Sequence, residues 1–207
     1  MAGRGLFFSF EGIDGSGKST QARRLAETLT AEGRGVVLTR EPGGSPGAEA
    51  IRRLLVEGDP GRWSPLTELL LFNAARRDHL EQTIEPALAA GRIVVCDRFA
   101  DSSRVYQGAA RSELRRLADR LHAEVIGLEP DLTLVIDMEP GAALARGLAR
   151  RSGEDRFEAM GEAFQARLRD GFRALAAEFP ARCVLIDGDR PEAEIAADIL
   201  ARARPLL

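Results

Sequence analysis

The sequence predicts a three-layer α/β fold in which helices flank a parallel sheet of five strands. Two observations support this prediction. Five short apolar runs alternate with longer segments of helical periodicity, and their near-continuous hydrophobicity is typical of strands buried on both faces. A glycine-rich turn joins the first run to the first helical segment, where such folds bind phosphate. The length of 207 residues suits one domain spanning residues 1–207.

The five predicted strands cover residues 6–11, 36–40, 93–97, 132–137 and 183–187. The helical patterns cover residues 18–32, 47–57, 65–90, 113–126, 141–150, 158–179 and 191–204, and Gly33 suits a C-terminal cap for the first of them. Pro86 should kink or interrupt the third pattern near Thr83. Charged residues follow four strands, so we expect a ligand site at the carboxyl edge of the sheet.

The glycine-rich turn, residues 12–19, matches the Gly-x-x-x-x-Gly-Lys-Ser/Thr pattern of a phosphate-binding P-loop, which makes the predicted fold P-loop NTPase-type. We expect ATP to be bound by Gly12, Ile13, Asp14, Gly15, Ser16, Gly17, Lys18, Ser19 and Thr20. Lys18 should reach the β- and γ-phosphates, and the Ser19 hydroxyl should bind Mg²⁺. The alternatives are a flexible Gly-Ser turn and a dinucleotide fingerprint, although the latter needs a third glycine that this turn lacks.

The use of basic residues supports this interpretation. Lys18 is the sole lysine among 29 basic residues, and the rest are arginine. A lysine at this one position is expected if the site needs a compact, flexible ammonium group and a planar guanidinium does not fit.

The composition excludes several classes of protein. The hydrophobic fraction of 44%, the charged fraction of 29% and the net charge of −3 are those of a globular protein, and they argue against a nucleic-acid polymer as partner. The sequence shows neither an apolar run long enough to span a membrane nor a signal peptide, so we expect a cytoplasmic protein without a membrane partner. Cys96 and Cys183 lie in strand-like runs and should be buried free thiols.

Two further segments carry candidate binding residues. Phe72 and Arg76 are four residues apart in a helical pattern, so they could stack on a base and bond its edge, or be a core phenylalanine beside a solvated arginine. Arg150, Arg151 and Arg156 flank a short polar stretch between two helical patterns. Residues 150–156 are then either a lid over transferring phosphates or a charged turn, and the P-loop favours the lid.

Across essentially the whole chain the sequence resembles the thymidylate kinases. The resemblance is carried by Phe-Glu-Gly-Ile-Asp-Gly-Ser-Gly-Lys-Ser-Thr at residues 10–20, Thr-Arg-Glu-Pro-Gly-Gly at 39–44, Asp-Arg-Phe at 97–99, Tyr-Gln-Gly at 106–108 and Pro-Asp-Leu-Thr-Leu at 130–134. These stretches in this order are more specific than a P-loop alone. The resemblance implies transfer of the γ-phosphoryl group of ATP to dTMP, giving dTDP and ADP, with Mg²⁺ and as a homodimer through helices around residues 65–90.

The resemblance also implies roles for individual residues. Asp14 would accept a hydrogen bond from the 3′-hydroxyl of dTMP. Arg98 would hold its phosphate, with Arg40 and Glu41 of the second signature nearby. Phe72 would stack on thymine, Arg76 would contact the base edge, and Tyr106 would fill the space of a ribonucleotide's 2′-hydroxyl. The remaining implied residues are Ser102, Ser103 and Gln107 in the same pocket, Asp97 with Ser19 on Mg²⁺, and Arg146 on adenine.

Two positions depart from patterns of the family. Gly15 occupies the place where some members carry an arginine, so this chain resembles the bacterial pattern in which the lid supplies catalytic arginines, here Arg150, Arg151 and Arg156, beside Lys18 and Arg98. Phe99 replaces a common tyrosine, which removes one hydroxyl. The alternatives are another P-loop nucleoside monophosphate or small-molecule kinase and a nucleotide-dependent switch, for which no Asn-Lys-x-Asp motif is found.

Overall fold

The computed structural model describes residues 3–58, 61–110, 112–149 and 161–207. These residues form a parallel sheet of five strands in the order β2-β3-β1-β4-β5. The strands are β1 (Phe7–Glu11), β2 (Val36–Arg40), β3 (Ile93–Asp97), β4 (Leu132–Asp137) and β5 (Cys183–Asp187). The central strand β1 leads into the P-loop, which therefore lies between the carboxyl ends of β3 and β4.

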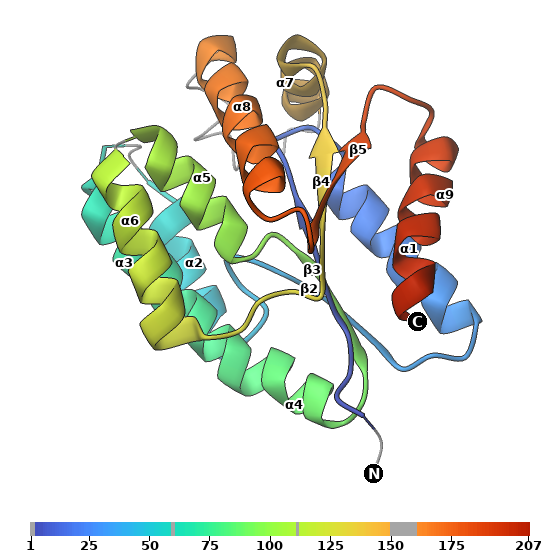
Figure 1. Cartoon of the computed structure of the whole chain (residues 1–207). Coiled ribbons are helices and arrows are strands. Elements are labelled where there is room, and N and C mark those ends of the chain that lie inside the picture. The colour runs from blue at the N-terminus through green and yellow to red at the C-terminus, as the bar shows by residue number, and fades with distance from the viewer. Residues whose placement is uncertain (1–2, 59–60, 111, 150–160) are drawn as a thin grey trace.

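Helices cover both faces of this sheet (Figure 1). On one face lie α1 (Lys18–Ala31) and α9 (Glu192–Ala203), followed by a 3-10 turn, Arg204–Leu206. The other face is covered by α3 (Pro65–His79), α4 (Glu85–Ala89), α5 (Ala100–Ala110) and α8 (Glu162–Glu178), and α6 (Ser112–Leu121) packs on α5 and α3. The remaining helices are α2 (Pro46–Val56), beside α3, and α7 (Pro140–Ala149), after β4. The predicted three-layer α/β fold is confirmed.

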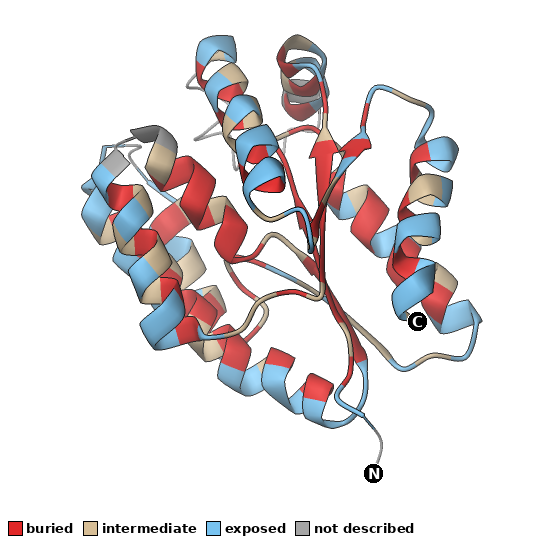
Figure 2. Ribbon diagram, viewed as in Figure 1, coloured by how far each residue is buried: buried red, intermediate tan, exposed pale blue. Residues whose placement is uncertain are grey.

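The core occupies both sides of the sheet because successive side chains of a strand point to opposite faces. Phe8 and Phe10 of β1 pack with α1 and α9, whereas Phe7 packs with Phe99 and the helices of the other layer. Figure 2 shows buried residues along the central strands and on the inward sides of the helices. The prediction of burial on both faces is wrong for the edge strand β2, which has no buried residue, because it has a neighbouring strand on one side alone. Cys96 and Cys183 are buried free thiols, as predicted.

The helix α5 was missed by the sequence prediction. Its sequence, Ala-Asp-Ser-Ser-Arg-Val-Tyr-Gln-Gly-Ala-Ala, contains serine, aspartate, valine and glycine, which are poor helix formers in isolation. Tertiary hydrogen bonds replace intrinsic propensity: buried Glu11 accepts from the backbone N–H groups of Phe99 (2.8 Å) and Ser102 (3.1 Å) at the start of the helix.

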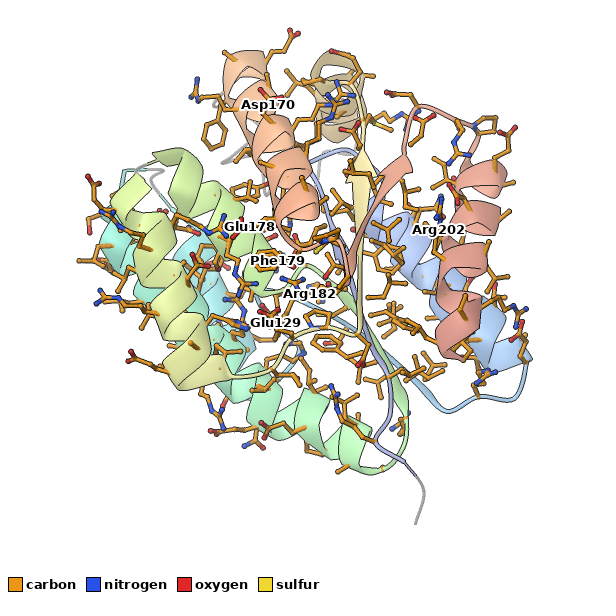
Figure 3. All side chains as sticks on the ribbon, viewed as in Figure 1. Glu129, Asp170, Glu178, Phe179, Arg182 and Arg202 are labelled. Carbon is orange, nitrogen blue, oxygen red and sulfur yellow. The ribbon has the colours of Figure 1, made fainter. Side chains whose placement is uncertain are left out.

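Buried ion pairs also hold α5 in place. Asp101 is 1% exposed and accepts hydrogen bonds from Arg104 (2.7 Å) and Arg182 (2.6 Å). Glu129 pairs with both arginines, and Figure 3 shows it with Arg182 and Phe179 between α6 and the start of β5. This network ties α5 to the sheet and so fixes the helix that carries several predicted site residues.

The predicted interruption near Thr83 is confirmed in a specific form. The α-helical pattern of α3 gives way to a π-helical stretch, Leu80–Ile84, and the α-helix resumes as α4. Pro86 lies in the first turn of α4, a position at which the N–H group that proline lacks is not required. A second π stretch, His122–Ile126, follows α6. Among the described helices, none is long and apolar enough to cross a membrane.

Candidate active site

The P-loop turns tightly because three of its glycines adopt positive φ angles. Gly12 has φ 135°, Gly15 φ 81° and Gly17, which caps α1, φ 95°. A Cβ atom on Gly15 would lie 1.9 Å from the carbonyl oxygen of Ala143 in α7. This contact explains why the arginine that some thymidylate kinases carry here has no place in this chain.

Lys18 lies at the start of α1, folded back along the loop. Its Nζ donates to the carbonyl oxygen of Ile13 (2.6 Å), and the residue is 5% exposed. Burial, followed by the charge of Arg98, lowers the pKa of Lys18 to about 8. The anionic phosphates that a P-loop binds would raise this pKa again and so favour the charged form of the lysine.

Ser19 and Asp97 meet at the carboxyl ends of β1 and β3. The Ser19 hydroxyl donates to Asp97 Oδ2 (2.5 Å), while Asp97 Oδ1 is buried and has no hydrogen-bond partner in the structure. An orphaned carboxylate oxygen beside a hydroxyl suits a Mg²⁺ ion, which retains several waters and takes few protein ligands. Accordingly, no group of three or more His, Cys, Asp or Glu side chains that could hold a metal occurs in the described part of the chain.

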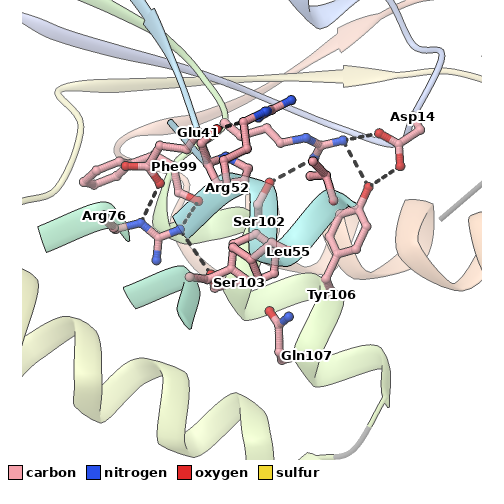
Figure 4. Close-up of a pocket in the computed structure, with 14 residues that line it drawn as sticks. Asp14, Glu41, Arg52, Leu55, Arg76, Phe99, Ser102, Ser103, Tyr106 and Gln107 are labelled. Carbon is pink, nitrogen blue, oxygen red and sulfur yellow. Dashed lines mark hydrogen bonds and ion pairs between the residues drawn. The ribbon is translucent and has the colours of Figure 1, made fainter. Parts of the chain in front are cut away.

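A cavity of about 750 Å³, including its open mouth, lies beside the P-loop (Figure 4). One wall is apolar and aromatic and the rest is charged or polar. The lining residues are Asp14, Glu41, Pro42, Arg52, Leu55, Val56, Phe72, Arg76, Arg98, Phe99, Ser102, Ser103, Tyr106 and Gln107.

Arg98 stands between this cavity and the P-loop. Its Nη1 donates to Ser102 Oγ (2.9 Å) and its Nη2 to Asp14 Oδ1 (2.5 Å) and Tyr106 Oη (3.1 Å), while the Tyr106 hydroxyl donates to Asp14 Oδ2 (2.9 Å). Although burial opposes both shifts, Tyr106 and Asp14 raise the pKa of Arg98, and Arg98 and Lys18 lower the pKa of Asp14. Both groups are therefore charged near neutral pH.

The backbone of Arg98 is itself unusual. Its φ angle is 70°, and within the described chain no other residue except glycine has a positive φ. Such a conformation costs about 1–2 kcal/mol in an isolated chain, and here the Arg98 N–H donates to Phe10 O (2.9 Å) while the buried Cys96 thiol donates to Arg98 O (3.0 Å). The turn aims the guanidinium at the cavity rather than at solvent.

The far end of the cavity is formed by Phe72 and Arg76 of α3. Phe72 is partly exposed at the wall, whereas Arg76 is 3% exposed, and its Nε donates to Glu41 Oε2 (2.7 Å). The alternative of a solvated arginine is therefore wrong. Arg76 Nη2 also donates to the Phe99 carbonyl (3.2 Å) and Ser103 Oγ (3.1 Å).

The structure brings most of the predicted substrate-binding residues to this cavity, namely Asp14, Glu41, Phe72, Arg76, Arg98, Ser102, Ser103, Tyr106 and Gln107. Arg40 lies elsewhere: it pairs with Glu49 (3.1 Å) and lines a second cavity together with Ser19 and Asp97. Arg146 is exposed on α7, with its Nη1 3.6 Å from Met138 Sδ. Arg150, Arg151 and Arg156 lie outside the described residues.

Sequence reasoning missed the contribution of α2. Arg52, Leu55 and Val56 line the cavity, and Arg52 donates to the Pro42 carbonyl. No local motif marks them. The packing of α2 against α3 brings them to the site.

The comparisons with known proteins agree with this geometry. The thymidylate kinase family model matches residues 10–199. A thymidylate kinase from Dinoroseobacter shibae is 71% identical over 97% of both chains, and one from Ruegeria pomeroyi is 65% identical over 96% of this chain and 94% of that protein. The crystal structure of thymidylate kinase from Ehrlichia chaffeensis matches with a TM-score of 0.79 at 36% identity, covering 97% of this chain and 99% of that one.

These relatives span nearly the full length of the chain, and the expected signatures converge on one cavity beside a P-loop. The chain belongs to the thymidylate kinase family, the ATP-dependent phosphotransferases that act on dTMP.

Proposed function

We propose that the cavity beside the P-loop holds dTMP with its phosphate at Arg98 and its base at Phe72 and Arg76, while the P-loop holds the phosphates of ATP. The observation that carries this proposal is the position of Arg98. Its guanidinium lines the cavity and also donates to Gly12 O (3.3 Å) within the P-loop. A phosphate bound there would lie beside the phosphates of the donor nucleotide.

The charges of the site support an anionic acceptor. The Asp14–Arg98 ion pair is preformed, so an arriving phosphate competes with Asp14 for the guanidinium and releases carboxylate oxygens for another donor. The 3′-hydroxyl of dTMP is such a donor. Tyr106 is held between Asp14, Phe164 and Phe172, which supports its role as the wall that excludes a 2′-hydroxyl.

Transfer needs no side chain as general base in this scheme. The attacking phosphate oxygen of dTMP is anionic near neutral pH because its second pKa is about 6. The task of the protein is to hold two polyanions in line and offset their repulsion. Lys18 and Arg98 supply positive charge, and we assign further positive charge to Arg150, Arg151 and Arg156 as a lid.

Mg²⁺ fits beside Ser19 and Asp97, where it would neutralise phosphate charge on the donor. Asp97 Oδ1, buried without a partner, would accept a hydrogen bond from a metal-bound water. The homodimer and the adenine contact of Arg146 are further parts of this proposal and are suggested by the family resemblance. The cytoplasmic location and the single domain over residues 1–207 are also proposed, from the lack of a signal peptide or membrane-spanning run in the sequence and from the chain length.

The test is ADP release measured with ATP and a panel of acceptors: dTMP, dUMP, dCMP, dGMP, AMP and shikimate. The proposal predicts the highest kcat/KM with dTMP. A higher value with a purine monophosphate or with shikimate would show that the cavity reads another acceptor.

A further inference from the structure

We propose that His79 is a positioning residue that holds Glu41 and thereby aims Arg76 at the edge of the bound base. The proposal rests on the proposed binding of dTMP in the cavity. His79 itself does not line the cavity, and no step of phosphoryl transfer uses it.

The three side chains form one buried chain of contacts. His79 Nδ1 lies 3.2 Å from Glu41 Oε1, and Arg76 Nε donates to Glu41 Oε2 (2.7 Å). The side chains of His79, Glu41 and Arg76 are 0%, 4% and 3% exposed. A bond lost here would therefore leave a nearly buried charged group short of a partner, because the described residues offer each carboxylate oxygen of Glu41 a single donor.

The bonds of Arg76 determine which of its nitrogens is left for a ligand. Nε is bound to Glu41, and both N–H groups of Nη2 have acceptors in the Phe99 carbonyl and Ser103 Oγ. Nη1 is the terminal nitrogen for which the described residues offer no acceptor. Because a guanidinium is planar, fixing Nε and Nη2 fixes the direction of Nη1. A shift of Glu41 would rotate this nitrogen away from a base edge.

Thr39 determines which nitrogen of His79 carries the proton. Its Oγ1 lies 2.7 Å from His79 Nε2, so a hydroxyl donating there places the ring proton on Nδ1, where it is donated to Glu41. Gly44 leaves room for this bond, because a Cβ on Gly44 would lie 2.3 Å from His79 Nε2 and 2.4 Å from Thr39 Oγ1. Thr39 lies at the end of β2 and Glu41 directly follows that strand, while Arg76 and His79 lie in the last turn of α3, so the imidazole links the strand end to the helix.

Two substitutions of His79 distinguish the role of Nδ1 from that of Nε2. H79N retains an amide donor near the position of Nδ1, whereas H79Q places its amide near Nε2 and leaves Glu41 Oε1 without a donor. We expect H79Q to raise KM for dTMP by about tenfold, the usual effect of losing a hydrogen bond to a charged group. KM for ATP should change less than about twofold, and H79N should stay close to the wild type.

The preference for thymine over cytosine distinguishes a positioning role from a purely structural one, because a loss of stability alone would not change this preference. Thymine presents a carbonyl acceptor where cytosine presents an amino donor. If Nη1 reads this carbonyl, H79Q should lower the ratio of kcat/KM for dTMP over dCMP. His122 provides the matched control: it is also a buried histidine paired with a glutamate, Glu129 (2.9 Å), but it lies outside the cavity. H122Q should leave this ratio unchanged.

The outcomes are distinct. The positioning role is overturned if the ratio of kcat/KM for dTMP over dCMP is unchanged in H79Q. It is also overturned if KM for dTMP and KM for ATP rise equally in H79Q. R76Q separates the two proposals, because an unchanged KM for dTMP in R76Q refutes the binding of the base at Arg76, whereas a raised KM in R76Q with normal H79Q refutes only the role of His79. If H79Q does not fold, the ring ¹⁵N signals of the two histidines in the wild type decide: dTMP should shift those of His79 and not those of His122, and no shift at His79 overturns the proposal.

Discussion

Glu11 provides a prediction whose size and sign both follow from the structure. The residue is fully buried at the end of β1, and its carboxylate accepts from the N–H groups of Phe99 and Ser102 and from the Ser102 hydroxyl (2.6 Å). Burial, followed by the charge of Asp101, raises the pKa of Glu11 from 4.5 to about 7. Replacement by glutamine removes this titration and keeps the shape.

The sign follows from proton linkage. Because the folded state binds the Glu11 proton more tightly than the unfolded chain, the stability from this group is complete below pH 4.5 and is lost as pH rises through about 7. Between pH 5 and pH 8 the free energy of unfolding of the wild type should therefore fall, relative to that of E11Q, by about 2 to 3 kcal/mol. A constant offset of about 1–2 kcal/mol against E11Q is expected from the poorer bond to Ser102.

Equilibrium urea unfolding at pH 5, 6, 7 and 8 measures this difference. The matched control is D137N, because hydrogen bonds from Arg169 and Arg173, which stay charged over this range, lower the pKa of Asp137 against the opposing effect of burial. That carboxylate is ionised throughout most of this range in both states, so its difference from the wild type should stay nearly constant. Parallel pH curves for the wild type and E11Q would contradict a raised pKa of Glu11 in the folded protein.

Three further predictions concern the transfer site. Acetylation of Lys18, the sole lysine, should abolish turnover and be prevented by ATP with Mg²⁺; full activity in protein shown by mass spectrometry to be modified there would contradict its role. Y106A should lower the ratio of kcat/KM for dTMP over its ribonucleotide, because the Tyr106 ring forms the cavity wall beside Asp14. An unchanged ratio would show that Tyr106 does not select the sugar. D97N should raise the Mg²⁺ concentration for half-maximal rate by about tenfold or more, with KM for dTMP nearly unchanged, and an unaltered Mg²⁺ titration would exclude Asp97 from metal binding.

Much of the fold could be predicted because its signals are local. The strands at 36–40, 93–97, 132–137 and 183–187 have the predicted bounds, and the glycines of the P-loop identify the turn after β1. The helix at 100–110 could not be predicted in this way, because its start depends on Glu11, some 90 residues earlier, and on buried ion pairs with Arg182. Such bonds are invisible to propensity and periodicity.

In the candidate site, too, the residues within local motifs could be predicted and the features that depend on tertiary packing could not. The family motifs predicted Asp14, Arg98 and Tyr106, and the structure joins them in one hydrogen-bonded group. They did not predict the wall formed by α2, the left-handed backbone of Arg98 or the contact of His79 with Glu41. These features arise where elements far apart in sequence pack together, so a single sequence carries no direct record of them.

The substitution R98Q tests whether Arg98 holds the acceptor phosphate. Its kcat/KM with dTMP should fall at least about 100-fold, the loss expected when a charge-assisted phosphate contact is removed. The Kd for ATP, measured by titration calorimetry, should stay within about threefold of the wild-type value, because the P-loop binds the donor. A near-normal kcat/KM for dTMP, or a loss confined to ATP affinity, would contradict the placement of the acceptor phosphate at Arg98.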